Sequence, residues 1–214
     1  MTTDHSELGR TYRGAPPQQR QQERRTRLLD AAVEVFGTSG YRTATVEKVC
    51  IQAGLTKRYF YESFSNSEDL LMATYSRATD DMRENILAGA AADTDSSEQV
   101  LRGALTGFFT FVAEHPKSAR IAFVEILGVS PVVDALYRKT TASFSATLLE
   151  VAETVGSSRG LAGPNRRTLA MGLVGAVLTI AQQWLLSPEP EPLDSVIASA
   201  HTILAAVVFG RVDG

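Results

Sequence analysis

The sequence predicts an all-α protein, and three observations support this prediction. Apolar residues recur at helical spacing along most of the chain, and no segment alternates apolar and polar residues for long enough to indicate a strand. Glycine and proline clusters lie between the helical patterns, as in "GTSG" at 37–40 and "SPEPEP" at 187–192. Residues that can cap helices precede several of the patterns, at Thr45, Asn66 and Ser96.

The chain opens with a polar segment, residues 1–20, that is rich in Gln, Arg, Pro and Gly. Such a composition buries too little apolar area to offset chain entropy, so we expect a flexible basic arm. The first helix is expected from about Gln21, because apolar residues between Leu28 and Phe36 share one face. We expect it to end at Gly40, since glycine suits the left-handed position after a helix.

Two short helices are expected next. Behind the cap Thr45, apolar residues over 46–53 repeat the i, i+3, i+4, i+7 spacing, and Gly54 ends this pattern. A further helix is expected from the cap Thr56 to about Glu62. Two short helices joined by a glycine turn, after a longer helix, are typical of a helix-turn-helix unit.

The rest of the chain predicts a second, helical domain. We expect a loop at "GAAADTDSS", residues 89–97, and a helix that begins after "SSEQ" and ends at His115-Pro116. The other body helices are expected from Asn66 to about Ile86, Lys117 to about Leu127, Pro131 to about Val155, Asn165 to about Leu186 and Leu193 to about Phe209. The domains are therefore expected as a basic arm at 1–20, a helix-turn-helix domain at 21–66 with its motif at about 45–64, and a helical domain at 67–214.

Charge is divided unequally along the chain. Residues 1–66 contain ten Lys and Arg against seven Asp and Glu, whereas residues 67–214 contain eleven against seventeen. A basic front on an acidic body favours a polyanionic partner for the front.

Cysteine content and hydropathy indicate the compartment. The single cysteine, Cys50, cannot form an internal disulfide, and the first twenty residues contain no apolar run that could serve as an export signal, so we expect a cytoplasmic protein. The apolar segment "LAMGLVGAVLTIA", 169–181, is shorter than the about 20 residues that span a membrane. We interpret it as a buried helix and expect no membrane partner.

The segment "GLTKRYFYESF", 54–64, carries the functional signal. On a helix, Phe60 and Phe64 share a face and point inward, which leaves two cations and two phenols on the outside: Lys57, Arg58, Tyr59 and Tyr61. Cations neutralise phosphates, and tyrosines offer hydroxyl donors and ring faces, so this surface is suited to DNA. The alternative is an ordinary solvated helix face.

Residues 24–75 resemble the DNA-binding domain of the TetR family of bacterial transcriptional regulators. The resemblance depends on the spacing of Phe36, Gly40-Tyr41, Thr45-Val46, Val49, Ala53-Gly54, Tyr61, Phe64 and Glu68-Asp69-Leu70-Leu71. It implies that Thr45 and Tyr61 bind phosphates, that Thr56 and Lys57 lie at the tip of the recognition helix, and that Arg58 and Tyr59 read bases. Ser67 stands where the family often has a phosphate-binding lysine, so one phosphate contact is expected either to be missing or to be supplied elsewhere, by Arg24, Arg25, Arg42 or the basic arm.

The same resemblance implies that the body dimerises and binds a small effector. The residues expected at the dimer interface are Gly172, Gly175, Ala176, Val196, Ile197, Ala200, Ile203 and Leu204, with packing inside one subunit as the alternative. The residues expected around the effector are Phe108, Phe111, His115, Phe123, Tyr137, Phe144 and Trp184, with ordinary core packing as the alternative.

The sequence therefore predicts a homodimeric, DNA-binding transcriptional regulator, a repressor released from a palindromic operator by a mainly apolar small molecule. The alternatives are a small-molecule binding protein, or a regulator that activates or answers to a protein partner without a metabolite. No cofactor, metal site or enzymatic activity is expected, because the histidines lack partners at metal-binding spacing and no catalytic motif is present.

Overall fold

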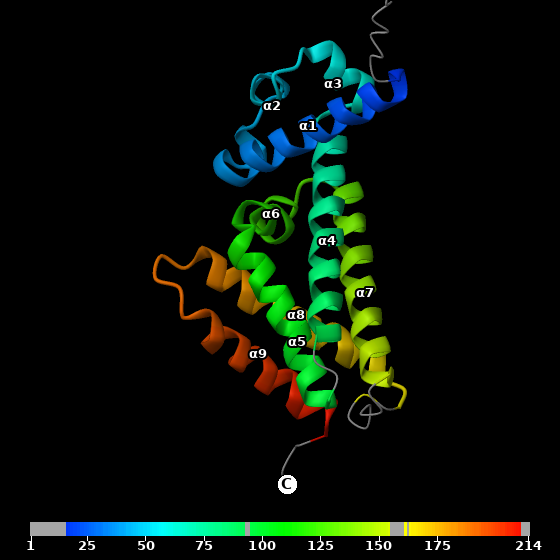
Figure 1. Ribbon diagram of the computed structural model, residues 1–214, viewed down its shortest axis with the longest axis vertical. Coiled ribbons are helices and arrows are strands. Elements are labelled where there is room, and N and C mark those ends of the chain that lie inside the picture. The colour runs from blue at the N-terminus through cyan, green and yellow to red at the C-terminus, as the bar shows by residue number, and fades with distance from the viewer. Residues whose placement is uncertain (1–15, 93–94, 155–160, 162, 211–214) are drawn as a thin grey trace, which may run out of the picture.

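A computed structural model describes residues 16–92, 95–154, 161 and 163–210, and the regular structure in these ranges is helical throughout. The all-α fold predicted from the sequence is confirmed, with a helix-turn-helix at the N-terminal end and a helical body (Figure 1). The head contains α1 (Pro17–Ser39), the 3₁₀ turn η1 (Tyr41–Thr43), α2 (Val46–Ala53) and α3 (Lys57–Ser63). The body contains α4 (Ser67–Ala92), α5 (Ser97–Glu114), α6 (Pro116–Arg120), the π-helical turn η2 (Ile121–Glu125), α7 (Pro131–Thr154), α8 (Arg166–Leu186) and α9 (Leu193–Val208).

Helix α1 is longer than the sequence predicted. It begins at Pro17, a residue that is well suited to the first helical position because its fixed φ matches the helix and its missing N–H would have no partner there. Residues 17–20, expected in the flexible arm, are therefore helical, and residues 1–15 of the expected arm lie outside the described residues. The helix ends at Gly40, whose φ of 83° is positive as predicted but whose ψ of 150° is extended rather than left-handed.

Helix α4 connects the head to the body. The Asn66 side chain accepts a hydrogen bond from the Asp69 amide at 2.8 Å, while Asp69 Oδ2 accepts one from the Ser65 amide at 3.0 Å, so the start of the helix is capped from both sides. The helix continues to Ala92, and the loop predicted at 89–97 is wrong for residues 89–92.

Glycine at 89 serves close packing instead of ending the helix. A Cβ built on Gly89 would lie 2.1 Å from the carbonyl oxygen of Gly103, and one on Gly107 would lie 2.1 Å from that of Asn85. The backbones of α4 and α5 are therefore in direct contact, which no larger residue at these positions allows.

The helix predicted at 117–127 divides into two parts. The α-helical turn α6 ends at Arg120, and the wider π-helical turn η2 follows before Ile126. Ile121 and Ile126 are fully buried, which anchors the turn in the core.

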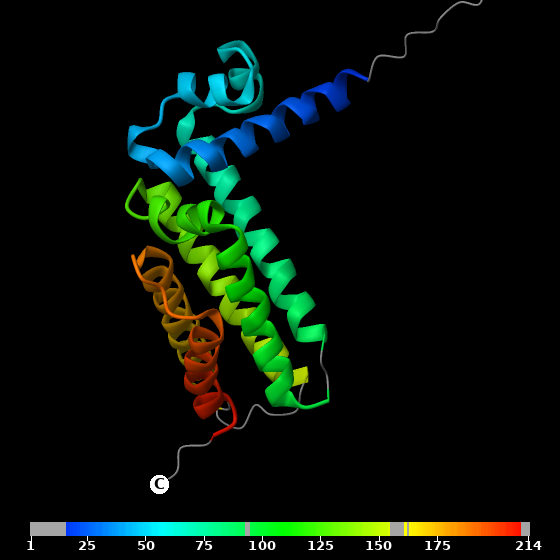
Figure 2. The same ribbon diagram turned by 60° about the vertical axis from the view of Figure 1, so that its left-hand side comes forward.

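The layers of the body are visible from two directions. The head lies at one end of α4, and α8 and α9 form an outer layer on the side of α5 away from α4 (Figures 1 and 2). Between these layers is an apolar core that includes Phe109 and Tyr75. Burial raises the pKa of Tyr75 to about 12, although a hydrogen bond with Thr140 opposes this shift, so the phenol stays neutral at physiological pH.

Candidate nucleic-acid interface and effector cavity

The recognition helix α3 has one buried and one exposed side. Phe60 is fully buried and Phe64 is 2% exposed, whereas Lys57 and Arg58 are exposed and Tyr61 is 60% exposed. The orientation predicted from the spacing of the two phenylalanines is thus the one observed. A short helix with a cationic and phenolic outer surface can approach a duplex without moving any other part of the head.

Sequence reasoning missed three arginines of α1 that hold the helix-turn-helix in place. Arg27 Nη2 donates to the Ala53 carbonyl at 2.6 Å, beside Gly54, whose φ of 62° and ψ of 38° make the left-handed turn between α2 and α3. Arg25 Nη1 donates to the Ser63 carbonyl at 2.8 Å, where α3 ends. These contacts fix both ends of α3 against α1.

Arg24 packs on Tyr59, a residue expected to read bases. The Arg24 guanidinium lies 4.5 Å from the centre of the Tyr59 ring and 3.7 Å from the Glu62 carboxylate. Tyr59 is half-buried beneath this cation, which covers one face of its ring. Arg24 and Tyr59 therefore pack against each other. Arg25 instead donates to the protein backbone, and this bond competes with the phosphate contact expected from it in place of the one missing at Ser67.

The other residues expected at DNA lie in different environments. Thr45 is exposed and caps α2, with its hydroxyl accepting from the Lys48 amide at 3.2 Å. Thr56 precedes α3 and is exposed, and its side chain makes no capping bond, contrary to the predicted cap. Ser67 is half-buried at the first position of α4.

Arg42, expected at a phosphate, also contacts the body. Its exposed guanidinium donates one hydrogen bond to the Gly128 carbonyl at 3.2 Å and so joins the head to the body. This contact could not be predicted from local sequence patterns, because the two residues are 86 positions apart.

The junction between head and body is centred on Glu125, in the π-helical turn η2. Its carboxylate accepts hydrogen bonds from the Tyr41 amide at 2.8 Å and from Arg120 Nε at 2.9 Å, and its side chain is 9% exposed. Burial and the nearby charge of Glu68 raise the pKa of the Tyr41 phenol, which is therefore neutral at this contact. A second, exposed ion pair joins Lys117 of α6 to Glu34 of α1.

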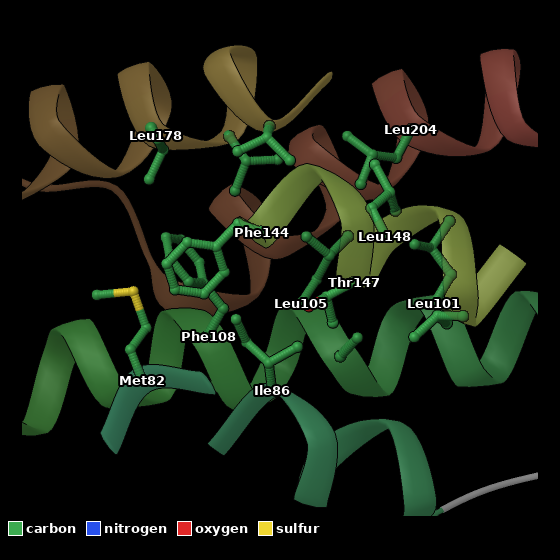
Figure 3. Close-up of a pocket in the computed structure, with 14 residues that line it drawn as sticks. Met82, Ile86, Leu101, Leu105, Phe108, Phe144, Thr147, Leu148, Leu178 and Leu204 are labelled. Carbon is green, nitrogen blue, oxygen red and sulfur yellow. The ribbon is translucent and has the colours of Figure 1, made fainter. Parts of the chain in front are cut away.

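The body contains a strongly apolar cavity of ≈ 90 Å³ between α4, α5, α7, α8 and α9. Figure 3 shows Met82 and Ile86 of α4 on one side and Leu178 of α8 and Leu204 of α9 on the other. Thr147 is the one polar side chain among the fourteen described residues that line it. A cavity with this lining favours a hydrocarbon ligand over a polar one.

A second, more polar cavity of ≈ 160 Å³ lies next to the first, because Leu178 lines both. Its wall includes Tyr137, Thr141 and Gln182, and Gln182 Nε2 donates to the Phe123 carbonyl of the π-helical turn at 2.7 Å. This cavity therefore borders the turn that carries Glu125.

The predicted pocket residues are divided between different places. Phe108 and Phe144 line the first cavity, and Phe123 and Tyr137 line the second. Three predicted residues line neither of these two cavities: Phe111 is buried against the ring of His115, His115 is exposed, and Trp184 packs on Phe109 and donates to the Glu191 carbonyl. Most of the residues that line the first cavity are aliphatic, and a prediction based on aromatic side chains does not include them.

The residues predicted at the dimer interface fall into two groups, one at least partly exposed and one buried inside the subunit. Gly172 is exposed and Ile203 is 42% exposed, whereas Gly175 and Ala176 are half-buried and Gly175 also lines the second cavity. The prediction is wrong for four residues buried inside the subunit, where helical spacing alone could not place them: Val196, Ile197, Ala200 and Leu204. Helix α8 is also long and apolar enough to cross a membrane, the one such helix in the described ranges. Only 22% of its apolar window is buried, so the buried helix predicted for residues 169–181 is wrong for most of its length within one subunit.

Comparisons with known proteins agree with this geometry. Residues 28–74 match the bacterial regulatory proteins of the tetR family. The chain is 29% identical over 175 residues to the HTH-type transcriptional activator FasR of Mycolicibacterium smegmatis, covering 82% of this chain and 78% of that one. The head of this chain therefore contains a DNA-binding domain of the TetR family.

Two solved structures share the whole fold. The fatty acid degradation regulator FadR from Bacillus halodurans superposes with a TM-score of 0.75 at 19% identity, covering 94% of this chain and 100% of that one. FadR from Bacillus subtilis, solved in complex with stearoyl-CoA, gives a TM-score of 0.71 at 19% identity over 84% of this chain and 96% of that one. The matched domain and the relative from Mycolicibacterium smegmatis identify the chain as a DNA-binding transcriptional regulator. In its described part, no three His, Cys, Asp or Glu side chains are grouped to hold a metal.

Proposed function

We propose that this regulator binds an operator with two-fold symmetry as a homodimer, with α3 in the major groove. The exposed side of α3 and the neighbouring helix starts supply the contacts. The residues assigned to DNA are Thr45, Thr56, Lys57, Arg58, Tyr61 and Ser67. Lys57 and Tyr61 bind phosphates in this proposal, and Arg58 reads a base edge once it leaves its ion pair with Glu62.

The dimer is assigned to the outer face of α8 and α9. A Cβ atom added to Gly172 or Gly175 would have no neighbouring atom of the described residues within 4 Å, so there is open space beside both glycines. A second helix can therefore approach α8 closely there. Ile203 adds an exposed apolar side chain on α9. A two-fold dimer doubles the number of bases read and places the recognition helices about 34 Å apart, or a multiple of that distance.

The effector is assigned as a molecule with a long fatty acyl chain. The observation that supports this proposal is the lining of the first cavity, where thirteen of fourteen residues are apolar. The structural neighbour from Bacillus subtilis is complexed with stearoyl-CoA, a ligand of this class. Leu178 separates the two cavities, and a rotamer change there provides a longer channel for the chain.

The response to effector is assigned to two connections between body and head. One is α4, which lines the cavity with Met82 and Ile86 and continues to the head. The other is the π-helical turn, whose Phe123 lines the second cavity and whose Glu125 holds the Tyr41 amide. An effector can shift operator affinity only by the difference in its affinity for the two head positions.

Several finer points stay proposals. The boundary at residue 66, the cytoplasmic location and the repressor role are those predicted from the sequence, and the boundary at residue 20 is moved to Pro17, where α1 begins. The relative from Mycolicibacterium smegmatis is named an activator, so the sign of regulation has to be measured with a reporter driven by the bound promoter.

Selection of bound duplexes from a random pool tests the proposal directly. We expect a palindrome whose binding is lost with Lys57→Ala and Tyr61→Phe together, and whose affinity changes when oleoyl-coenzyme A is added. Binding of oleoyl-coenzyme A with no selected DNA would instead favour a small-molecule binding protein. Selected DNA with no response to acyl compounds would favour a regulator controlled by a protein partner.

A further inference from the structure

Arg83 of α4 lies at the only polar point in the described lining of the apolar cavity. Its guanidinium carbon is 4.8 Å from the centre of the Phe144 ring, and its Nη1 donates to Thr147 Oγ1 at 3.1 Å. Phe144 and Thr147 both belong to α7 and both line the cavity (Figure 3). Arg83 therefore reaches across from α4 to α7 and touches the cavity wall from outside.

The charge of Arg83 has no carboxylate partner among the described residues. Two arginines near the head have one: Arg77, also on α4, is 2.8 Å from Asp30, and Arg120 is 2.9 Å from Glu125. Arg83 is only partly exposed, and its partners are a neutral hydroxyl and an aromatic ring. Thr147 in turn donates to the Ser143 carbonyl at 3.2 Å, so its oxygen is oriented to accept from Arg83.

We propose that Arg83 binds the anionic head of the acyl effector, at the place where the acyl chain leaves the cavity between α4 and α7. This inference depends on the fatty acyl effector proposed above. An ionised head cannot enter the cavity itself, because thirteen of its fourteen described lining residues are apolar and burying an unpaired charge is costly. The head must therefore remain at the edge, and Arg83 is the cation that already contacts that edge.

The guanidinium is well suited to this role. It has five N–H donors, and the bond to Thr147 uses one of them. Its planar group can donate two parallel hydrogen bonds to a carboxylate or a phosphate while it stays stacked on Phe144. The two acyl ligands that share this chemistry are a free fatty acid, through its carboxylate, and a coenzyme A thioester, through its phosphates. Both are favoured over neutral lipids of equal length.

The test compares three probes with one acyl chain: oleic acid, oleoyl-coenzyme A and the neutral oleyl alcohol. Each is titrated, below the concentration at which it aggregates, into the full-length wild-type chain and its Arg83→Met and Arg83→Lys variants. The fluorescence of Trp184, the only tryptophan of the chain, which packs on Phe109 in the body, reports binding. Arg77→Met is the matched control, because it removes a cation from the same helix that does not contact the cavity wall.

We expect Arg83→Met to lower affinity for at least one anionic probe by about 10-fold, the loss of one hydrogen bond to a charged group, and to leave the alcohol unchanged. Arg83→Lys should retain part of the affinity, and Arg77→Met all of it. A loss confined to oleic acid identifies the carboxylate as the bound group, and a loss confined to the thioester identifies the phosphates.

Two failures have different meanings. Equal losses for the anionic and neutral probes in Arg83→Met would show that Arg83 only supports the cavity wall, which overturns this inference and leaves the acyl effector standing. No binding of any probe by the wild-type chain would overturn the acyl effector, and this inference with it.

Discussion

Replacing Glu125 with glutamine should destabilise the protein at the junction between head and body by a predictable amount. The Glu125 carboxylate accepts from the Tyr41 amide and from Arg120, and a carboxamide has one oxygen for these two donors. Losing a charge-assisted hydrogen bond costs about 1.5–3 kcal/mol, and weakening the other costs about 1 kcal/mol. Because the Arg120 side chain is 39% exposed and can be rehydrated, we reduce the expected loss to about 2 kcal/mol.

Thermal unfolding followed by circular dichroism measures this loss. For a chain of this size, about 2 kcal/mol corresponds to a fall in Tm of about 4–8 °C. The matched control is Glu34→Gln, which breaks the other ion pair of the same junction, where Lys117 and Glu34 are 44% and 47% exposed. That variant should lose about 0.5 kcal/mol. Equal losses, or a larger loss in the control, would refute the argument that the buried carboxylate holds the head.

Four further outcomes are expected. Lys57→Ala should weaken operator binding and lower the slope of log affinity against log salt by about 1, measured by fluorescence anisotropy, because one phosphate contact is removed. Thr45→Ala should cost about 1 kcal/mol in urea unfolding, because the hydroxyl that caps α2 is lost; an unchanged midpoint would contradict the cap. Cys50 should react with a thiol reagent at pH 8 only after unfolding, because burial raises the pKa of its thiol and its residue is 4% exposed. Gly107→Ala should destabilise the chain by about 3 kcal/mol, because the new Cβ would lie 2.1 Å from the Asn85 carbonyl oxygen; a stability equal to wild type would disprove this packing.

The head was predictable from sequence because its signals are local. Thr45 caps α2, Gly54 makes the left-handed turn, and the spacing of Phe60 and Phe64 fixes which side of α3 is buried. Each of these features depends on residues within one turn or two of each other. The arginine contacts from α1 were missed because they join residues more than twenty positions apart.

The body was less predictable because its residues have several possible partners. The apolar side of α9 packs inside the subunit, where Leu204 also lines the cavity, and helical spacing cannot distinguish this from a dimer interface. Gly89 looked like a loop residue because a glycine in sequence is compatible with both a break and a close helix contact. The π-helical turn at Ile121–Glu125 has no sequence pattern that distinguishes it from an α-helix.

The glycine contacts between α4 and α5 restrict how the protein can change shape. With Gly89 against Gly103 and Gly107 against Asn85, the two backbones interlock at two levels, so one helix cannot tilt or slide without forcing carbonyl groups into the other. A movement of the head that tilts α4 would therefore have to move α5 with it. The contact between α4 and α7, which Arg83 crosses, has no such close glycine contact among the described residues.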